Sequence, residues 1–510
     1  MALPLGQLVS VLPGVACEGD PSAAVAQVTA DSREAGPGVL FVAVRGTGGD
    51  GHRFLAQAAA AGAAGLVIAA DHAGPVPGGV PVVRCADTRP APALLARALH
   101  GTPDDALVTA AVTGTNGKTT TAFLLQALLD RVQGPCGLLG TIRYSDGRES
   151  VAAPLTTPGG PVFYAWLGRM RDNGCGSVAM ELSSHALDQQ RTAGLGLDVA
   201  VMTNLGRDHL DYHADLAAYL AAKARIADLL RRDGARRGTL CLNAGDPAFA
   251  DLATGDVPVL RWCARPEAPA PGADLQVTTA VLGLDGTRLG LDWRGEKLEL
   301  ASPLVGRFNV ENLTAALAAG LALGVEAGAC CAALAAVTQV PGRLERIGLP
   351  QGGIAVVDYA HTHDALDAVL TTCDELLTGP DGRRRGRLLA VFGCGGDRDR
   401  GKRPLMAQVV ARGADAAWIT SDNPRSEDPA AICADITAGF DAVPDPRAAG
   451  REVVIDRTAA VEAALAAAGA GDIVVIAGKG HEDYQIVGDR VLDLDDRRIV
   501  RDWIARGGTS

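Results

Sequence analysis

Apolar and polar positions alternate along the chain in successive blocks of strand-like and helix-like segments. In the first block, residues 25–101, the runs VLFVAVRG, GLVIAA and VPVVRC are separated by alanine-rich helical stretches. A second block begins after residues 101–105 with the strand-like VTAAVTG and the helix-like AFLLQALLDRV, and later contains SVAMEL, DVAVMTNL and TLCLN. Strands that alternate with helices are typical of α/β domains.

A third block starts near residues 340–343. The second block ends with a loop at 264–273, strand-like residues at 275–300 and the helical ENLTAALAAGLALG. In the third block, helical segments alternate with the strand-like runs IAVVDYA, LLAVFG, AAWIT, EVVID and DIVVIAG. A chain of 510 residues exceeds what one hydrophobic core usually supports. We therefore expect an α/β protein of three domains, 1–104, 105–340 and 341–510, in which the central domain has a mostly parallel sheet and the last is Rossmann-like.

Charge and cysteine usage narrow the function classes. The 47 Lys and Arg against 59 Asp and Glu give a formal charge of −12, which argues against a nucleic-acid partner. The 11 Cys form no CxxC pair, so neither a zinc site nor a disulfide framework is expected. The N-terminal apolar run is broken by proline and glycine, and no apolar stretch is long enough to span a membrane. We expect a cytoplasmic monomer without membrane insertion.

A phosphate-binding loop is predicted between the strand VTAAVTG and the helix that follows it. Backbone N–H groups at a helix N-terminus attract phosphate, and Lys118 would reach the terminal phosphates while Thr119 offers its hydroxyl to Mg²⁺. The general pattern has glycine where this chain has Val112. The alternative is an ordinary glycine-rich turn. The candidate ATP-binding residues here are Gly114, Thr115, Asn116, Gly117, Lys118, Thr119 and Thr120.

Two further groups stand out in the central block. Glu181 ends the run SVAMEL, where a carboxylate could be a metal ligand, a buried structural group or a cap. Lys223 falls on an apolar helical stripe at the spacing of Leu216, Leu220, Ala227 and Leu230. The residues alone favour a lysine that extends its ammonium to solvent.

The string TGTNGKT, at residues 113–119, resembles the phosphate loop of the Mur ligases and the related folylpolyglutamate synthases. The resemblance extends over most of the chain. It implies an N-terminal domain that binds a UDP-linked precursor, a central ATP-binding domain and a C-terminal domain that binds an amino acid. It also implies that Lys223 is carbamylated by CO₂ and that Mg²⁺ is held by Thr119, Glu181, His209 and carbamylated Lys223.

The same resemblance implies a second set of nucleotide-binding residues near the start of the third domain. These are Asn309, Asn312, Arg343 and Asp358. The family often has proline where this chain has His363, in the string DYAHTHD, and this departure leaves the local turn uncertain. Asp358 and His361 are retained.

Loops in the first two domains resemble those that bind the UDP-muramyl dipeptide. Serine and glycine are common in loops, so the N-terminal matches are weak alone. Arg191 could pair with a carboxylate in fork geometry. The implied precursor-binding residues are Ser32, Thr47, Gly48, Gly49, Thr156, Thr157, Ser183, Gln189 and Arg191.

The segment Asp422-Asn423-Pro424-Arg425 follows the strand AAWIT. Read alone, it is a β-turn with a helix cap. It is similar to the signature of diaminopimelate-adding members of the family, in which the arginine meets the distal carboxylate, a group that lysine lacks. The implied amino-acid-binding residues are Arg398, Asp422, Asn423, Pro424, Arg425, Gly478 and Glu482.

The resemblance thus implies an ATP-dependent amide-bond ligase that acts through an acyl phosphate. Lys118, Glu181, His209 and Lys223 are the expected catalytic residues. Small molecules are the expected partners: ATP, a UDP-muramyl dipeptide and meso-diaminopimelate. The alternatives are a lysine-adding ligase, a folylpolyglutamate synthase and a non-catalytic protein that senses nucleotide or UDP-precursor.

Overall fold

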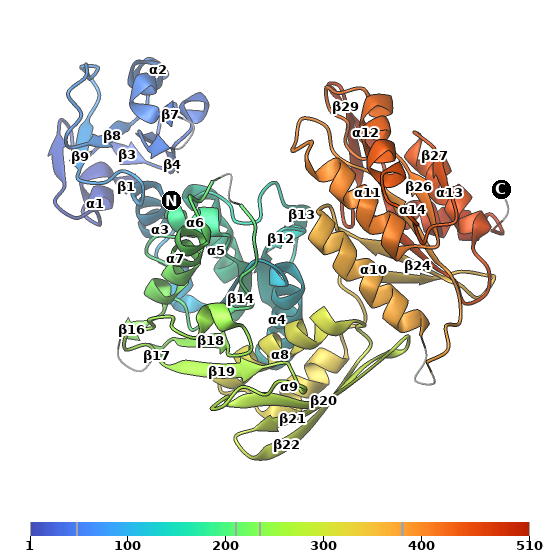
Figure 1. The fold of residues 1–510 in the computed structure, drawn as a ribbon. Coiled ribbons are helices and arrows are strands. Elements are labelled where there is room, and N and C mark those ends of the chain that lie inside the picture. Colours follow the sequence, from blue (N-terminus) through green and yellow to red (C-terminus); the bar gives the residue numbers. More distant parts are fainter. Residues whose placement is uncertain (1, 47–48, 210–211, 234–235, 379–381, 509–510) are drawn as a thin grey trace. The chain divides into compact units, whose positions relative to one another are not determined.

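The computed structural model describes residues 2–46, 49–209, 212–233, 236–378 and 382–508. It divides into two compact units. One comprises Met1–Thr279, Leu289–Leu300 and Glu311–Leu334, and the other comprises Ala280–Arg288, Ala301–Val310 and Ala335–Ser510. Each unit contains sheets covered by helices (Figure 1).

The N-terminal part of the first unit is built on a five-stranded sheet. Its order is β2 (Ala16–Glu18), β9 (Val82–Cys85), β8 (Gly65–Ala69), β5 (Val39–Val42) and β4 (Gln27–Thr29), and all neighbours except β2 and β9 are parallel. All residues of β5 and β8 are buried, as expected for a parallel sheet with a core on both faces. The helices of this part are α1 (Leu5–Val9), α2 (Leu55–Ala60) and α3 (Ala91–Leu99).

An eleven-stranded sheet forms the central part of the chain. Its order is β13 (Ser150–Ala152), β12 (Arg143–Ser145), β11 (Cys136–Leu139), β14 (Ser177–Glu181), β10 (Val108–Thr113), β15 (Val199–Met202), β18 (Thr239–Asn243), β19 (Val259–Cys263), β20 (Leu275–Gly283), β21 (Gly286–Trp293) and β22 (Glu296–Ser302). Neighbours from β11 to β20 are parallel. The carboxyl ends of β10, β14 and β15 therefore meet at one edge.

Helices of the central part pack with its sheet in a shared apolar core. Buried apolar side chains such as Phe163 and Leu167 of α5 pack with Val178 and Met180 of β14 in its core. The helices are α4 (Lys118–Gln133), α5 (Gly160–Asp172), α6 (Ser184–Asp188), α7 (Leu216–Ala224), α8 (Arg307–Ala322) and α9 (Ala327–Ala335).

The C-terminal part has a six-stranded sheet in the order β23 (Glu345–Gly348), β24 (Ile354–Asp358), β28 (Ile473–Ala477), β25 (Leu388–Phe392), β26 (Ala416–Ile419) and β27 (Arg451–Val453). Only β23 is antiparallel among these strands. One face is covered by α10 (His363–Leu377), α11 (Lys402–Gly413) and α12 (Pro429–Asp441), and the other by α13 (Arg457–Ala467) and α14 (Asp496–Ala505). A hairpin of β29 (Tyr484–Val487) and β30 (Arg490–Asp493) completes it.

This architecture confirms the expected α/β class, with two mostly parallel sheets and a small N-terminal sheet in three successive parts of the chain. The described residues contain no helix with both the length and the hydropathy needed to cross a membrane.

The apolar helix predicted around Lys223 is shorter than the sequence pattern indicated. Helix α7 ends at Ala224 and gives way to a 3-10 turn over Arg225–Leu229. Leu216, expected on the buried stripe, is 41% exposed, whereas Lys223 is only 1% exposed. The prediction that Leu216 is buried on this stripe is therefore wrong, and so is the interpretation, drawn from the residues alone, that Lys223 extends its ammonium to solvent.

The substitution of His363 for the usual proline leaves the following helix intact. His363 is the first residue of α10, and Thr362 caps that helix by accepting a hydrogen bond at its Oγ1 from the Ala365 N–H at 3.3 Å. Proline is favoured at this first position because its φ is already helical, but it is not required there. Helix α10 therefore begins at this position without proline.

Candidate active site

The phosphate loop joins β10 to α4 at the carboxyl edge of the central sheet. Gly114 and Gly117 have φ values of 149° and 84°, which disfavour other residues. A Cβ at Gly114 would collide with the side chain of Thr203, and one at Gly117 with that of Asn312. No side chain caps the N-terminus of α4, so its first N–H groups face the loop, as in anion-binding helix ends.

The side chain of Lys118 binds the backbone of this loop. Its Nζ donates to the carbonyl oxygens of Gly114 and Thr115, both at 2.9 Å. Behind it, Thr121 Oγ1 lies 3.3 Å from Asn312 Oδ1, so the structure brings this predicted nucleotide-binding asparagine against the loop. Thr120 is buried in the same turn of α4.

Glu181 ends β14 beside the loop and is buried. Its Oε2 accepts hydrogen bonds from Thr119 Oγ1 at 3.0 Å and from Thr141 Oγ1 at 2.9 Å, and its Oε1 accepts from the Thr141 N–H at 2.7 Å. A carboxylate and a hydroxyl in contact form a set of hard oxygen donors, which suits Mg²⁺. Thr119 and Glu181 therefore fit the predicted metal site, and Thr141 is a residue that the sequence did not single out.

Lys223 reaches the same loop from α7. Its Nζ donates to Gly114 O at 2.7 Å and lies 4.2 Å from the centre of the Tyr219 ring. Burial, with a smaller contribution from nearby Lys118, lowers the pKa of Lys223 to about 6, although Asp208 opposes this shift. A buried lysine with such a pKa is a neutral amine at pH 7.

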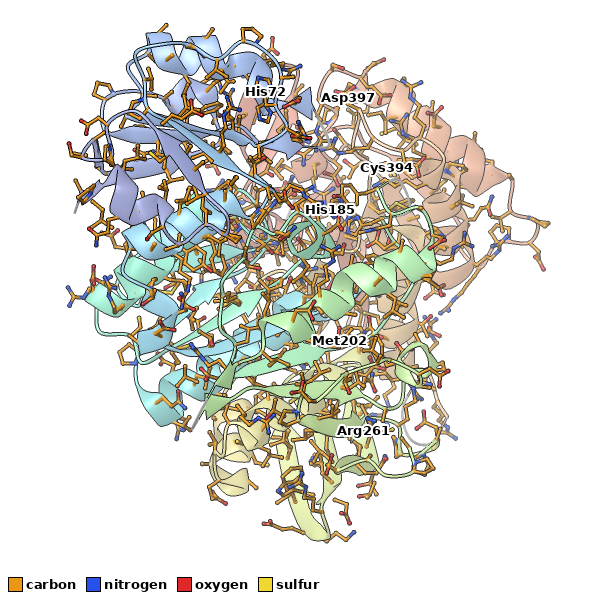
Figure 2. The ribbon with its side chains drawn as sticks, turned by 90° about the vertical axis from the view of Figure 1, so that its left-hand side faces the viewer. His72, His185, Met202, Arg261, Cys394 and Asp397 are labelled. Carbon is orange, nitrogen blue, oxygen red and sulfur yellow. The ribbon has the colours of Figure 1, made fainter. Side chains whose placement is uncertain are left out.

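His209 lies in a cluster of aromatic rings near this lysine. It has a positive φ of 53°, and its ring is 4.8 Å from that of His185 and 6.1 Å from that of Tyr219. His185 lies on α6 in the central part of the chain (Figure 2). Tyr219 thus connects the rings of the cluster to Lys223, and its hydroxyl lies 3.4 Å from Thr115 Oγ1.

The predicted precursor-binding residues of the central part form a hydrogen-bonded chain that leads to Glu181. Thr157 Oγ1 donates to Glu181 O at 2.7 Å and accepts from the Ser183 N–H at 3.1 Å. Thr156 Oγ1 lies 3.0 Å from Thr141 Oγ1. The side chains of Thr119 and Thr141 therefore bind the Glu181 carboxylate, while Thr157 binds the backbone carbonyl of Glu181.

Gln189 and Arg191 line a cavity of about 510 Å³ in the first unit, together with Arg45, Arg89 and Tyr212, among others. Arg191 donates to Gln189 Oε1 at 2.9 Å and to Thr157 O at 3.0 Å, so it joins the cavity to the chain around Glu181. Burial lowers the pKa of Arg191. Three arginines in one cavity favour an anionic ligand.

The N-terminal candidates are only partly described. Thr47 and Gly48 lie outside the described residues. Gly49 begins the short strand β7 (Gly49–Asp50), which pairs with β6 (Arg45–Gly46), and Gly46 lines the same cavity. Ser32 is buried and donates to Gln57 Oε1 at 3.2 Å.

Two of the nucleotide-binding candidates of the second unit lie together. The Arg343 guanidinium is 4.7 Å from the centre of the Tyr359 ring, and Asp358 accepts backbone N–H bonds from Leu344 and Ala360, both at 2.8 Å. Burial raises the pKa of Asp358, and the charge of Arg343 opposes this shift. Asn309 instead donates to Val305 O within its own turn, at 2.8 Å.

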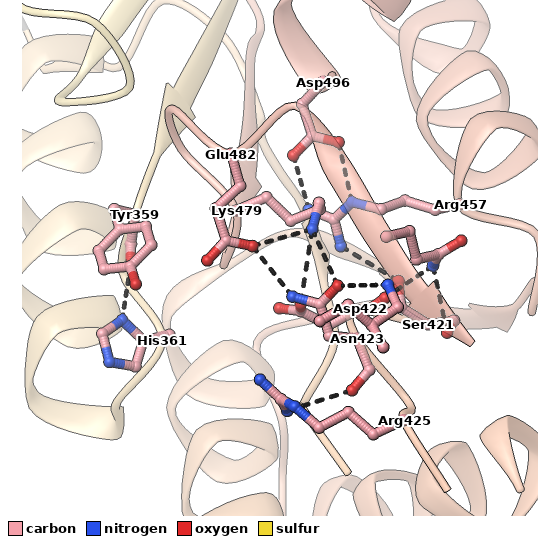
Figure 3. Close-up of polar contacts among 12 residues, drawn as sticks. Tyr359, His361, Ser421, Asp422, Asn423, Arg425, Arg457, Lys479, Glu482 and Asp496 are labelled. Carbon is pink, nitrogen blue, oxygen red and sulfur yellow. Dashed lines mark hydrogen bonds and ion pairs between the residues drawn. The ribbon is translucent and has the colours of Figure 1, made fainter. Parts of the chain in front are cut away.

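The amino-acid-binding candidates converge at the carboxyl ends of β26 and β28 (Figure 3). Asn423 Nδ2 donates to Glu482 Oε2 at 3.0 Å, and the Ile486 N–H donates to Asn423 Oδ1 at 2.9 Å. Gly478 has a φ of 114°, and a Cβ there would lie 2.7 Å from a carboxylate oxygen of Asp422.

Arg425 has a positive φ of 54° and is held by the backbone of the hairpin. Its N–H donates to Ile486 O at 3.0 Å and its carbonyl accepts from the Gly488 N–H at 2.6 Å. Pro424 O accepts from the Glu427 N–H at 3.0 Å, which confirms the predicted turn. Arg398 is exposed, and its neighbour Asp397 accepts hydrogen bonds from Ser426, so its loop is attached to the turn.

The structure adds three side chains to this region that sequence analysis did not assign. Lys479 donates to Glu482 Oε2 at 3.0 Å and is fully buried. Arg457 and Asp496 form a buried two-point ion pair at 2.8 and 2.7 Å. Lys479 lies in the sequence between two predicted site residues, Gly478 and Glu482, and this position could have identified it as a candidate. Nothing in the sequence indicated the pairing of Arg457 with Asp496.

Comparison with known proteins finds matches to three family models. The Mur ligase family catalytic domain matches residues 24–98, the Mur ligase middle domain matches 112–320, and the Mur ligase glutamate ligase domain matches 342–480. These segments follow one another in the same order as the three α/β parts of the chain.

Full-length relatives extend this likeness. Proteins named UDP-N-acetylmuramoyl-L-alanyl-D-glutamate–2,6-diaminopimelate ligase from Geobacter sulfurreducens and Gloeobacter violaceus are 40% and 43% identical to the chain and cover 97% and 95% of it, with the same shares of their own lengths. A solved structure of a ligase with that name is 32% identical, covers all of both chains and has a TM-score of 0.68. The chain belongs to the Mur ligase family.

Proposed function

We propose that the chain is an ATP-dependent ligase that joins meso-diaminopimelate to the D-glutamyl side-chain carboxylate of UDP-N-acetylmuramoyl-L-Ala-D-Glu. This is an amide-bond-forming step in the synthesis of peptidoglycan precursors. The observation that carries the proposal is the convergence of Lys118, Lys223 and Glu181 on one phosphate loop, in a chain whose full-length relatives have that name.

The reaction needs ATP because a carboxylate is a poor electrophile. In the proposal, the D-glutamyl carboxylate oxygen attacks the γ-phosphorus of ATP, the bond to the β-phosphate oxygen breaks, and ADP leaves. The loop N–H groups from Gly114 to Thr120 and the ammonium of Lys118 neutralise the charge that develops on the transferring phosphoryl group. The breaking of the hydrogen bonds from Lys118 to loop carbonyls would free its ammonium for phosphate.

Mur ligases use ATP and Mg²⁺. The side chains that would hold the metal here are Thr119, Glu181, His209 and carbamylated Lys223. When bound, Mg²⁺ supplies Lewis-acid stabilisation of phosphate oxygens. Thr141 orients the Glu181 carboxylate through both its backbone N–H and its hydroxyl.

Carbamylation of Lys223 is supported by its burial and its neighbours. Only a neutral amine adds to CO₂, and a pKa near 6 supplies one at physiological pH. The amine nitrogen forms a bond to the CO₂ carbon and loses a proton, which leaves an anionic carbamate. The side chains of Lys118 and Lys223 both donate to the carbonyl of Gly114, and their positive charges would repel each other there. A carbamate on Lys223 is negative and would instead attract the ammonium of Lys118.

The second step is acyl transfer. The amine of diaminopimelate attacks the acyl phosphate, phosphate leaves and an amide remains. We assign Ser32, Thr47, Gly48, Gly49, Thr156, Thr157, Ser183, Gln189 and Arg191 to the UDP-precursor. We assign Asn309, Asn312, Arg343 and Asp358 to the nucleotide.

In the C-terminal domain, Arg425 would meet the distal carboxylate of diaminopimelate. A guanidinium fork matches a carboxylate, and lysine has none at that end. Asp422 and Glu482 would meet the distal ammonium, with Arg398, Asn423, Pro424 and Gly478 completing the site. This argument favours diaminopimelate over the lysine-adding and folylpolyglutamate alternatives.

We further propose domain boundaries of 1–104, 105–340 and 341–510, and a monomer that works in the cytoplasm without a nucleic-acid partner. The net charge of −12 is the basis for the last of these.

The experiment that tests the proposal measures phosphate release from ATP and Mg²⁺ with UDP-N-acetylmuramoyl-L-Ala-D-Glu. Diaminopimelate, L-lysine and no amino acid are compared. Release that depends on diaminopimelate is the expected result. Equal release with lysine would remove the specificity claim, and no release with any acceptor would contradict the ligase itself.

A further inference from the structure

Lys479 is the buried cation at the centre of the amino-acid site. It follows β28 directly after Gly478, and its side chain has no exposed surface. Its Nζ donates to Glu482 Oε2 at 3.0 Å and to Asn423 Oδ1 at 3.4 Å, and lies 4.0 Å from Asp422 Oδ1. One ammonium is thus shared by two carboxylates, which offsets the cost of burying each of these charges.

The other cations nearby differ from Lys479 in their partners. Arg425 Nη1 donates to the carbonyl oxygens of Gly396 at 2.8 Å and Asn423 at 3.4 Å, and no carboxylate of the described residues forms an ion pair with it. Arg457 forms a two-point ion pair with Asp496, and its Nη1 and Nη2 each also donate to one backbone carbonyl. The hydrogen-bond acceptors of the Arg425 guanidinium are therefore neutral carbonyls, and the carboxylate of Asp397, whose pKa the charge of Arg425 helps to lower, is exposed to solvent.

These contacts fix the charge balance of the site. Asp422 and Glu482 contribute two negative charges, and Lys479 and Arg425 contribute two positive charges. The buried pair of Arg457 and Asp496 is neutral by itself, and the charges of the exposed neighbours Asp397 and Arg398 cancel each other. A balanced site whose Arg425 guanidinium is not in an ion pair matches a ligand end that carries both an ammonium and a carboxylate. It does not match a lone ammonium, which would leave Arg425 without a counter-charge.

We propose that Lys479 is the residue that sets the preference for a zwitterionic distal end over a lone ammonium, by cancelling one of the two carboxylates around it. This inference rests on the proposed function. Lys479 is a positioning residue, because it acts through Glu482 and Asn423. Without its charge, the site carries a net negative charge, and a lysine ammonium would neutralise it better than the zwitterionic end of diaminopimelate.

The test compares kcat/KM for diaminopimelate and for L-lysine in four proteins: wild type, Lys479→Met, Lys479→Arg and the double variant Lys479→Met with Asp422→Asn. In Lys479→Met, the ratio of the two values falls by about 10-fold or more, partly through a gain in lysine use. Lys479→Arg keeps the charge and the wild-type preference. The double variant restores the charge balance and moves the ratio back toward the wild-type value.

A purely structural role would lower both activities together and leave the ratio unchanged, which would overturn the proposal. Should Lys479→Met fail to fold, Asp422→Asn alone provides the opposite change: the site gains a net positive charge, and the ratio rises as lysine use falls further than diaminopimelate use. An unchanged or lower ratio in Asp422→Asn would also overturn it. Wild-type release of phosphate with diaminopimelate separates these outcomes from a failure of the proposed function.

Discussion

Lys118 and Lys223 donate to the same acceptor, the carbonyl oxygen of Gly114, at 2.9 and 2.7 Å. The two lysines come from different helices, α4 and α7, and are 105 positions apart in the sequence. Two ammonium groups on one oxygen would repel each other, and this proximity contributes to the lowered pKa of Lys223. The arrangement is therefore suited to a neutral or modified Lys223.

Replacement of Lys223 by alanine tests its proposed catalytic role. We expect Lys223→Ala to lower kcat by about 1,000-fold, because the carbamate can no longer form, and we expect short carboxylates such as acetate to restore part of the activity. Phosphate release with each added carboxylate is the measurement. Lys297→Ala, which removes an exposed lysine paired with Asp292, is the matched control and should retain wild-type kcat. Full activity of Lys223→Ala would refute the role.

The pKa of Lys223 also predicts a pH dependence of stability. Because its pKa falls from 10.5 to about 6 on folding, the unfolded chain binds more protons between these values. The free energy of unfolding therefore rises with pH between about 6 and 10.5. Below pH 6, Lys223 is charged in both states, and the full cost of burying its charge lowers the stability of the folded protein. Lys223→Met removes this contribution. In buffers without CO₂ or Mg²⁺, the Tm of wild type relative to Lys223→Met should increase from about pH 6.5 to about pH 9. A constant difference would show that Lys223 does not titrate in this way.

Thr141 predicts a metal-dependent phenotype. Thr141→Val keeps the backbone N–H bond to Glu181 but removes the hydroxyl that donates to its Oε2. The Mg²⁺ concentration for half-maximal phosphate release should rise by about 10-fold, as is usual when a group that orients a metal ligand is lost. Thr141→Ser restores the hydroxyl and should behave like wild type. An unchanged Mg²⁺ dependence in the valine variant would exclude this role.

Arg425 predicts a change of specificity. In Arg425→Ala, kcat/KM for diaminopimelate should fall by about 100-fold or more, because the distal carboxylate loses its partner, while the value for lysine changes little. Arg412→Ala, on the exposed side of α11, is the control. Equal losses for both amino acids would mean that Arg425 supports the fold of the loop and does not read the carboxylate.

The buried pair of Arg457 and Asp496 predicts a large stability effect. Its guanidinium also donates to Ser421 O at 3.3 Å and Ala477 O at 3.0 Å, at the ends of β26 and β28. Asp496→Asn leaves a buried unpaired guanidinium and should cost about 3–5 kcal/mol. The double variant Arg457→Met with Asp496→Leu should cost less than Asp496→Asn, as measured by chemical unfolding. A larger cost in the double variant would contradict this reading.

The sequence predicted those parts of the site that depend on local order along the chain. The strand–loop–helix pattern located Gly114, Lys118 and Thr119, and the turn string located Asn423 and Arg425, because each group is formed within a few consecutive residues. Lys223 was recognised as unusual by its spacing, but its burial was not, since it depends on the end of α7 and on the loop of a distant strand.

Contacts between segments far apart in the sequence were not predictable. Thr141 meets Glu181 because β11 and β14 are parallel neighbours, and only the sheet order shows this. Arg457 meets Asp496 because α13 and α14 cover the same face of the C-terminal sheet. Neither pair has a spacing or a motif that would have indicated it, so three-dimensional structure was needed.

The most direct test of the central claim follows an oxygen atom. UDP-N-acetylmuramoyl-L-Ala-D-Glu labelled with ¹⁸O in the D-glutamyl side-chain carboxylate is converted with ATP, Mg²⁺ and meso-diaminopimelate, and the released phosphate is analysed by mass spectrometry. Activation through an acyl phosphate transfers one ¹⁸O atom from the carboxylate to phosphate, and the product gains one diaminopimelate residue. Unlabelled phosphate, or phosphate release without amide formation, would contradict the account.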